Sequence, residues 1–88
     1  MAAMVVLFQF KLGANRSVSR LRLKQIWSVA SNSDKVTVNR IPRTVGLGHT
    51  YSLMGPSDLA NIAVVESRLR LLLDKHIEGA AITLMRMN

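Results

Sequence analysis

Basic side chains crowd the first half of the chain, where they could bind the phosphate groups of a nucleic acid. Residues 1–55 hold eight lysines and arginines against a single acid, Asp34. Phosphate binding requires several such cations on one surface, and single strands also need aromatic rings on which bases can stack. We expect the aromatic residues to serve the core, with Tyr51 and Phe10 the best candidates for exposure. The predicted phosphate contacts are Arg16, Arg20, Arg22, Lys24, Arg40 and Arg43.

The second half of the chain is electrically balanced, so the net charge of +7 belongs to the first half. Residues 56–88 contain four basic and four acidic side chains. Such an uneven field bears on partners rather than on fold. Arginine outnumbers lysine eight to four, which favours planar recognition of phosphate over simple solvation. We therefore expect nucleic acid as the partner, either DNA or RNA. The alternatives are an acidic patch on a larger protein, for which the chain would be a viral or mobile-element interaction module or inhibitor, and a merely solvated cationic surface.

Neither the residue types nor their order indicates catalysis. The chain has no cysteine, which excludes thiol nucleophiles, thiolate metal sites and disulfides. Its five acids are scattered, and His49 and His76 complete no Ser/His/Asp or paired-carboxylate pattern. The segment Gly46-Leu47-Gly48 resembles a fragment of a phosphate-binding loop, but it lacks the third glycine and the lysine of such loops. We expect no enzymatic activity, no cofactor and no metal site.

Length and composition predict one small domain over residues 1–88. A chain of this length buries only about 60–65% of the surface that its unfolded form exposes. Hydrophobic residues make up 49% of the chain, and apolar surface that remains exposed usually marks a contact site. We therefore expect self-association as a homodimer.

The sequence shows little likeness to segments that direct a chain to a membrane or an organelle. No apolar run reaches the roughly 18 residues that a membrane-spanning helix needs, so we expect no membrane partner. The apolar start has no basic region before it, unlike a secretory signal. We expect a cytoplasmic, nucleoid or nuclear location. A transit peptide stays an alternative, because residues 1–33 contain five basic residues, several serines and no acid.

Four segments carry strand patterns and one carries a clear helix pattern. The run 5–12 is β-branched and aromatic and ends at Gly13, as in a central strand. The segments 35–41 and 44–53 alternate between apolar and polar residues, and 81–87 is a further strand. A helix is predicted from Ser57, as its cap, to about Ile77, with His76 on its core face.

The segment 17–31 fits two structures, and the fold depends on which of them forms. As a helix it buries Leu23, Ile26, Trp27 and Ala30 and leaves Arg20, Lys24, Ser28 and Ser31 on a solvated stripe, with Arg22 out of place. Good helix formers and a length of about 15 residues favour this interpretation. The fold is then an α+β domain, a small antiparallel sheet with helices on one face, in the ferredoxin-like order β-α-β-β-α-β. The alternative is four strands, one long helix and a final strand.

A second apolar stripe lies on the long predicted helix, nearly opposite its core face. It consists of Ala60, Val64 and Leu71. A helix with two apolar faces is often buried twice, once on its own sheet and once against a partner. We therefore predict that this stripe is the dimer or partner interface.

Two families of nucleic-acid-binding modules share partial features with the chain. Residues 7–12 resemble the first-strand motif of RNA-recognition-motif domains, and Gly46-Leu47-Gly48 resembles the glycine spacing of their third-strand motif. The asparagine that this family places at Lys11 and its aromatics near Leu47 and His49 are missing. The alternative topology is similar to single-strand-binding modules of a transcription-coactivator type. These resemblances imply binding of nucleic acid on a sheet.

Overall fold

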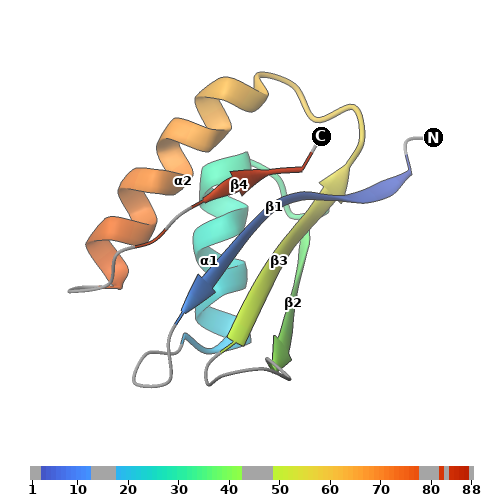
Figure 1. Cartoon of the computed structure of the whole chain (residues 1–88). Helices are drawn as coiled ribbons and strands as arrows, with labels where there is room; N and C mark the ends of the chain where they lie inside the picture. The colour runs from blue at the N-terminus through green and yellow to red at the C-terminus, as the bar shows by residue number, and fades with distance from the viewer. Residues whose placement is uncertain (1–2, 13–17, 43–48, 78–81, 83, 88) are drawn as a thin grey trace.

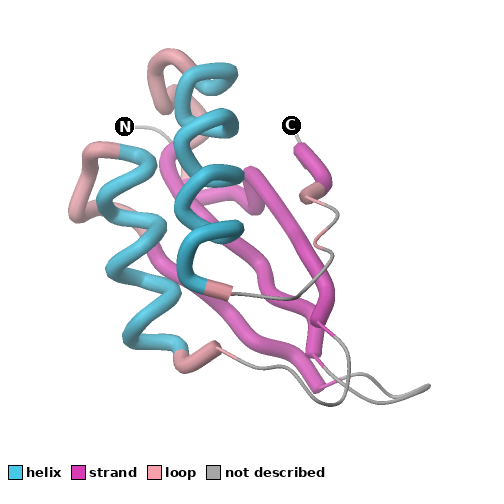
Figure 2. Tube along the Cα trace, turned by 90° about the vertical axis from the view of Figure 1, so that its left-hand side faces the viewer, coloured by secondary structure: helices cyan, strands magenta, loops and turns pink. Residues whose placement is uncertain are grey.

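The order of helices and strands is the ferredoxin-like one. The computed structural model describes residues 3–12, 18–42, 49–77, 82 and 84–87. Its elements are β1 (Met4–Leu12), α1 (Arg20–Ser31), β2 (Thr37–Pro42), β3 (His49–Pro56), α2 (Ile62–His76) and β4 (Met85–Arg86). The strands form one antiparallel sheet in the order β2-β3-β1-β4, and both helices lie on the same side of it (Figures 1 and 2). The predicted β-α-β-β-α-β fold is confirmed, and segment 17–31 contains a helix rather than a strand.

The core lies between the helices and the inner two strands, β1 and β3. Phe10 of β1 is opposite Tyr51 of β3, and their rings stack with centroids 5.0 Å apart. The register shifts between Val6 and Phe8, so a bulge turns both Leu7 and Phe8 into the core. The bulge explains why the adjacent residues Leu7 and Phe8 are both apolar.

Helix α1 has the caps expected of a short amphipathic helix. The hydroxyl of Ser19 accepts a hydrogen bond from the backbone N–H of Arg22, and Asn32 ends the helix in the left-handed conformation. The predicted core residues Leu23, Ile26, Trp27 and Ala30 are all buried. Ser31 is also buried, contrary to the prediction of a solvated stripe, because its hydroxyl donates to the carbonyl of Trp27 at 2.7 Å.

Helix α2 begins later than the sequence pattern predicts. Ser57 lies in a turn, and the cap position is Asn61, which has a φ of 57° and makes no side-chain capping bond. The residues that face the core are Val65, Leu69 and Leu73. His76 is exposed, so its predicted place on the core face is wrong.

The remaining boundaries differ less. The final strand is confined to Met85–Arg86, within the predicted 81–87. The face pattern predicted for β3 holds over the described residues, with Tyr51 and Leu53 in the core. In the part of the chain that the structure describes, neither helix is long and apolar enough to cross a membrane.

Candidate nucleic-acid interface

Two predicted phosphate contacts lie together on one side of α1. Arg20 and Lys24 are exposed and four residues apart, so their side chains are neighbours on the helix surface. Helix α1 packs beside α2 and beside β2. Successive residues of a helix are rotated by about 100°, which places Arg20 and Lys24 away from the α2 side of α1 and toward β2.

Arg40 of β2 extends this basic surface. It is two residues beyond the buried Val38 and opposite the buried Tyr51, so it lies on the side of the sheet that carries the helices. The start of α1 and the end of β2 are at the same end of the molecule (Figure 1). Arg20, Lys24 and Arg40 therefore form one surface, which we call the basic flank.

The other three predicted contacts do not join this surface in the described structure. Arg22 is on the opposite side of α1, where it lines a groove together with residues of α2. Arg16 and Arg43, and with them Gly46 and Gly48, lie outside the described residues.

The cations of the basic flank have no ionic partners among the described residues. The two ion pairs of the described residues lie elsewhere, and both involve Glu66 of α2. Glu66 pairs with Arg70 at 3.0 Å and with Arg86 at 3.5 Å. A second arginine of α2, Arg68, donates to the carbonyl of Ala30 at 3.3 Å. The charges of Arg70 and Arg86 are thus paired with an acid, whereas those of the basic flank are not paired within the described residues.

The start of α1 carries its charge against the helix dipole. Arg20 is the first residue of the helix and Arg22 the third, and no acid occupies the first turn. The N-terminal end of a helix has a partial positive charge, so each cation placed there disfavours folding by about 0.3–1 kcal/mol. An anion bound at this end would reverse that repulsion.

The open face of the sheet offers little to a nucleic acid. Strand alternation places Gln9, Lys11, Asn39 and Ile41 on it, and Lys11 is the only cation there among the described strand residues. Gln9 is held by a hydrogen bond from its Nε2 to the hydroxyl of Ser52 at 3.1 Å.

The aromatic residues are all in the core, as expected, and this includes Tyr51 and Phe10, the two best candidates for exposure. Each of Phe8, Phe10, Trp27 and Tyr51 is 0% exposed, and the chain contains no others. Hydrogen bonds to backbone groups fix two of these rings in place. The indole Nε1 of Trp27 donates to the carbonyl of Met54 at 2.9 Å, and the hydroxyl of Tyr51 accepts from the backbone N–H of Val18 at 3.1 Å. The chain therefore has no aromatic surface for base stacking.

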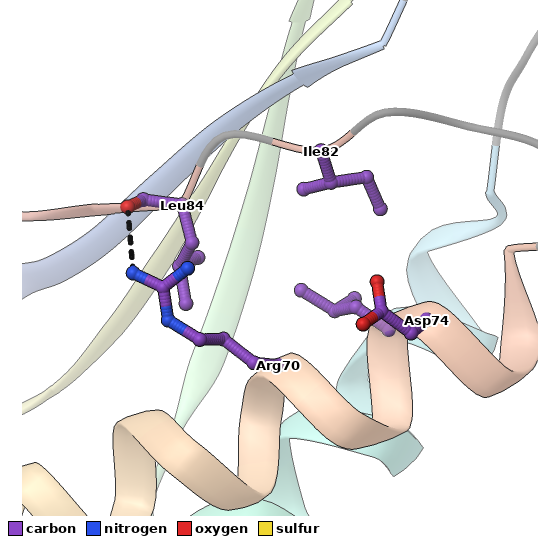
Figure 3. A pocket seen from close by; sticks show the side chains of 5 residues that line it. Arg70, Asp74, Ile82 and Leu84 are labelled. Carbon is purple, nitrogen blue, oxygen red and sulfur yellow. Dashed lines mark hydrogen bonds between the residues drawn. The ribbon is translucent and has the colours of Figure 1, made fainter.

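A small pocket of about 90 Å³ lies between α2 and the segment that leads into β4 (Figure 3). Arg70 and Asp74 border it from α2, and Ile82 and Leu84 border it from the segment above. The guanidinium of Arg70 is already engaged, with Glu66 at 3.0 Å and with the carbonyl of Leu84 at 3.5 Å (Figure 3). The pocket leaves no free cation to recognise an anion.

The histidines and acids of the described ranges form no metal site, since no three such residues come together there. His49 is half-buried, with its ring centroid 6.1 Å from that of Tyr51. Its Nδ1 is buried without a hydrogen-bond partner among the described residues. His76 is separate from it, in the groove beside Arg22.

Comparison with family models, curated protein sequences and solved structures finds no match to this chain. The β-α-β-β-α-β topology supports many unrelated functions, so the fold alone does not choose among them. We therefore infer function from the distribution of charged and exposed apolar side chains on the surface. The sequence analysis did not predict the groove between α1 and α2. Its only signal was Arg22, which fitted neither face of the predicted helix.

Proposed function

We propose that this protein binds nucleic acid through phosphate contacts and catalyses no reaction. The contacts come from the basic flank, Arg20, Lys24 and Arg40, and from Arg16 and Arg43 in the adjoining segments of the sequence. The observation that supports this function is the set of exposed cations without an ionic partner among the described residues. Several cations on one surface displace counterions from a polyanion, which is the main source of nonspecific affinity for nucleic acid.

Double-helical nucleic acid fits this surface better than single strands do. Proteins that bind single strands stack bases on exposed aromatic rings, in addition to contacting the backbone. All four aromatic rings of this chain are buried. A duplex presents closely spaced phosphates on its outside and keeps its bases stacked on one another, so contacts to phosphate alone suffice.

The test is fluorescence anisotropy with labelled single- and double-stranded DNA and RNA of equal length, measured over a series of salt concentrations. Each neutralised phosphate of B-DNA contributes about 0.9 to the slope of log K against log salt. Three contacts from the basic flank predict a slope near −2.7, made steeper by any contact from Arg16 and Arg43. The substitution Lys11→Ala on the open sheet face removes one charge away from the flank and should leave the slope unchanged.

Two results would overturn this proposal in different ways. Tighter binding of single strands than of duplexes would contradict the assignment to duplex phosphates. The absence of binding to all four polymers at about 0.1 M salt, where the Debye length is about 10 Å, would reject nucleic acid altogether. The basic flank would then be a surface for an acidic patch on another protein.

A homodimer formed through α2 is a second, separate proposal. Val64 is 50% exposed and Leu71 is 71% exposed, and both are nearly opposite the core face of α2. Ala60, just before the helix, is also exposed. Replacing Val64 and Leu71 together by Asp should shift the sedimentation coefficient toward that of a monomer without unfolding the chain. A wild-type protein that is already monomeric at about 100 μM would rule out this interface.

A further inference from the structure

A shallow groove separates the exposed sides of α1 and α2, the two helices that lie side by side in Figure 2. Its volume is about 130 Å³. It is distinct from the basic flank, which lies on the other side of α1. The residues that line it are Arg22, Gln25, Ile26 and Val29 from α1 and Leu72 and His76 from α2.

The two walls of the groove are antiparallel rows of side chains. On α2, Arg68, Leu72 and His76 follow one another at intervals of four residues and so lie on one side of the helix. Arg68 reaches the C-terminal end of α1, where it bonds the carbonyl of Ala30, and His76 lies beside Arg22 at the other end. Leu72 is therefore between these two charged ends.

The centre of the groove is apolar and incompletely covered. Ile26 forms its buried base, and Leu72 is half-buried. Val29 is 62% exposed although it lies in the wall. The space is large enough for one aliphatic side chain from another molecule, which would bury Val29 and cover Leu72. Burying a valine side chain stabilises a contact by about 1.5 kcal/mol.

The charges around the groove are of one sign. None of the lining residues is an acid. Arg22, Arg68 and His76 form no ion pair with a carboxylate of the described chain. A ligand of complementary charge therefore needs carboxylates on both sides of an apolar side chain.

We propose that this groove binds an acidic helical segment of a partner protein, which inserts one aliphatic side chain between Val29 and Leu72. Carboxylates about one turn to either side of that residue meet Arg22 and Arg68. This is a form of helix-in-groove recognition, in which the apolar side chain supplies affinity and the charges supply orientation. A second copy of this groove is a poor occupant, because its cations would repel those of the first. A bilayer is a poor occupant as well, because the apolar residues are recessed between two helices.

The test uses a designed helical peptide of about four turns with one central leucine and glutamates a turn to either side, titrated into methyl-labelled protein and followed by NMR. The methyl resonances of Ile26, Val29 and Leu72 should shift, and that of Ile41 on the open sheet face should not.

The change Val29→Asn should weaken binding about tenfold. The matched control Leu21→Asn, at a comparably exposed position of α1 outside the groove lining, should leave the affinity unchanged. Arg22→Glu should largely abolish the preference for glutamates over lysines, because Arg68 then faces an acid at the other end of the groove.

The proposal fails if the leucine–glutamate peptide shifts no methyl of the groove at millimolar concentration, or if the lysine peptide binds the wild-type protein equally well. It also fails if Val29→Asn changes the sedimentation coefficient or abolishes binding to anionic phosphatidylglycerol vesicles, since the occupant would then be a second copy or a bilayer. Val29→Asn removes no charge from the basic flank. The salt dependence of nucleic-acid binding is therefore expected to be unchanged, and the two proposals can fail independently.

Discussion

Replacing Arg20 by Glu should stabilise the fold and weaken the binding of nucleic acid at the same time. Arg20 is the first residue of α1, where the dipole of the helix disfavours a cation and favours an anion. It also lies four residues before Lys24, a spacing at which two like charges repel. If Arg20 contacts phosphate, replacing it by Glu relieves the repulsion with the helix dipole and with Lys24 and also removes one phosphate contact.

The expected gain in the free energy of unfolding follows from these two interactions. Reversing the charge at the start of a helix changes the dipole interaction by about 0.6–2 kcal/mol, which is twice the effect of one charge. Exchanging repulsion for attraction with Lys24 adds roughly 0.4–1 kcal/mol. Because the site is exposed and screened by solvent, we expect the low end of this sum, about 1 kcal/mol. For a chain of 88 residues, this corresponds to a rise in Tm of about 4–8 °C.

The assay is thermal unfolding followed by circular dichroism, at low salt and at 1 M salt, together with anisotropy on a DNA duplex. The rise in Tm should largely disappear at 1 M salt, where the Debye length is about 3 Å. The salt slope of duplex binding should fall by about 0.9. Lys11→Glu is the matched control, because it makes the same change in net charge on an exposed site of β1 with no helix dipole.

Two outcomes would refute this reasoning. If Arg20→Glu raises the Tm no more than Lys11→Glu does, the dipole and the pair with Lys24 are not the cause of any gain. If both variants retain the wild-type affinity and salt slope, Arg20 does not contact phosphate and does not belong to the binding surface.

Three further predictions concern the core and are measured by urea unfolding. Tyr51→Phe should lower the free energy of unfolding by about 1–3 kcal/mol, because the buried N–H of Val18 loses its acceptor; an unchanged midpoint would mean that another acceptor replaces it. Gly55→Ala should destabilise the fold by about 1 kcal/mol, because the added Cβ would lie 3.1 Å from Cδ1 of Leu7; a neutral effect would show that this side chain moves aside. Leu69→Ala should be the most harmful change, at about 2–5 kcal/mol, and a loss below 1 kcal/mol would contradict its full burial.

The type and order of the elements could be predicted because the apolar residues repeat with clear periods. Leu23, Ile26, Trp27 and Ala30 recur at helical spacing, and the structure buries all four on one side of α1. The alternation around Tyr51 likewise predicted which residues of β3 point inward. These patterns depend only on the geometry of a single helix or strand, so they can be read without knowledge of the neighbours.

The details that failed depend on contacts between elements or on local backbone conformation. Ser57 has the chemistry of a helix cap, yet α2 begins after Asn61, whose backbone is left-handed. Nothing in the sequence pattern marks the bulge in β1, which buries Leu7 and Phe8 in succession. Ser31 was expected on a solvated stripe of the helix with Arg20 and Lys24, whereas a hydrogen bond to the preceding turn of α1 satisfies its hydroxyl and allows its burial.

For the candidate sites, the sequence by itself determined the amount of charge and the half of the chain that carries it. A charge count requires no fold, and neither does the absence of cysteine. Only the tertiary structure decided which cations act together. It separated Arg22 from Arg20 and Lys24 by packing α1 between α2 and β2, so that opposite sides of one helix meet different neighbours. It also buried every aromatic ring in the core, because residues from β1, α1 and β3 that are distant in sequence meet there and exclude water.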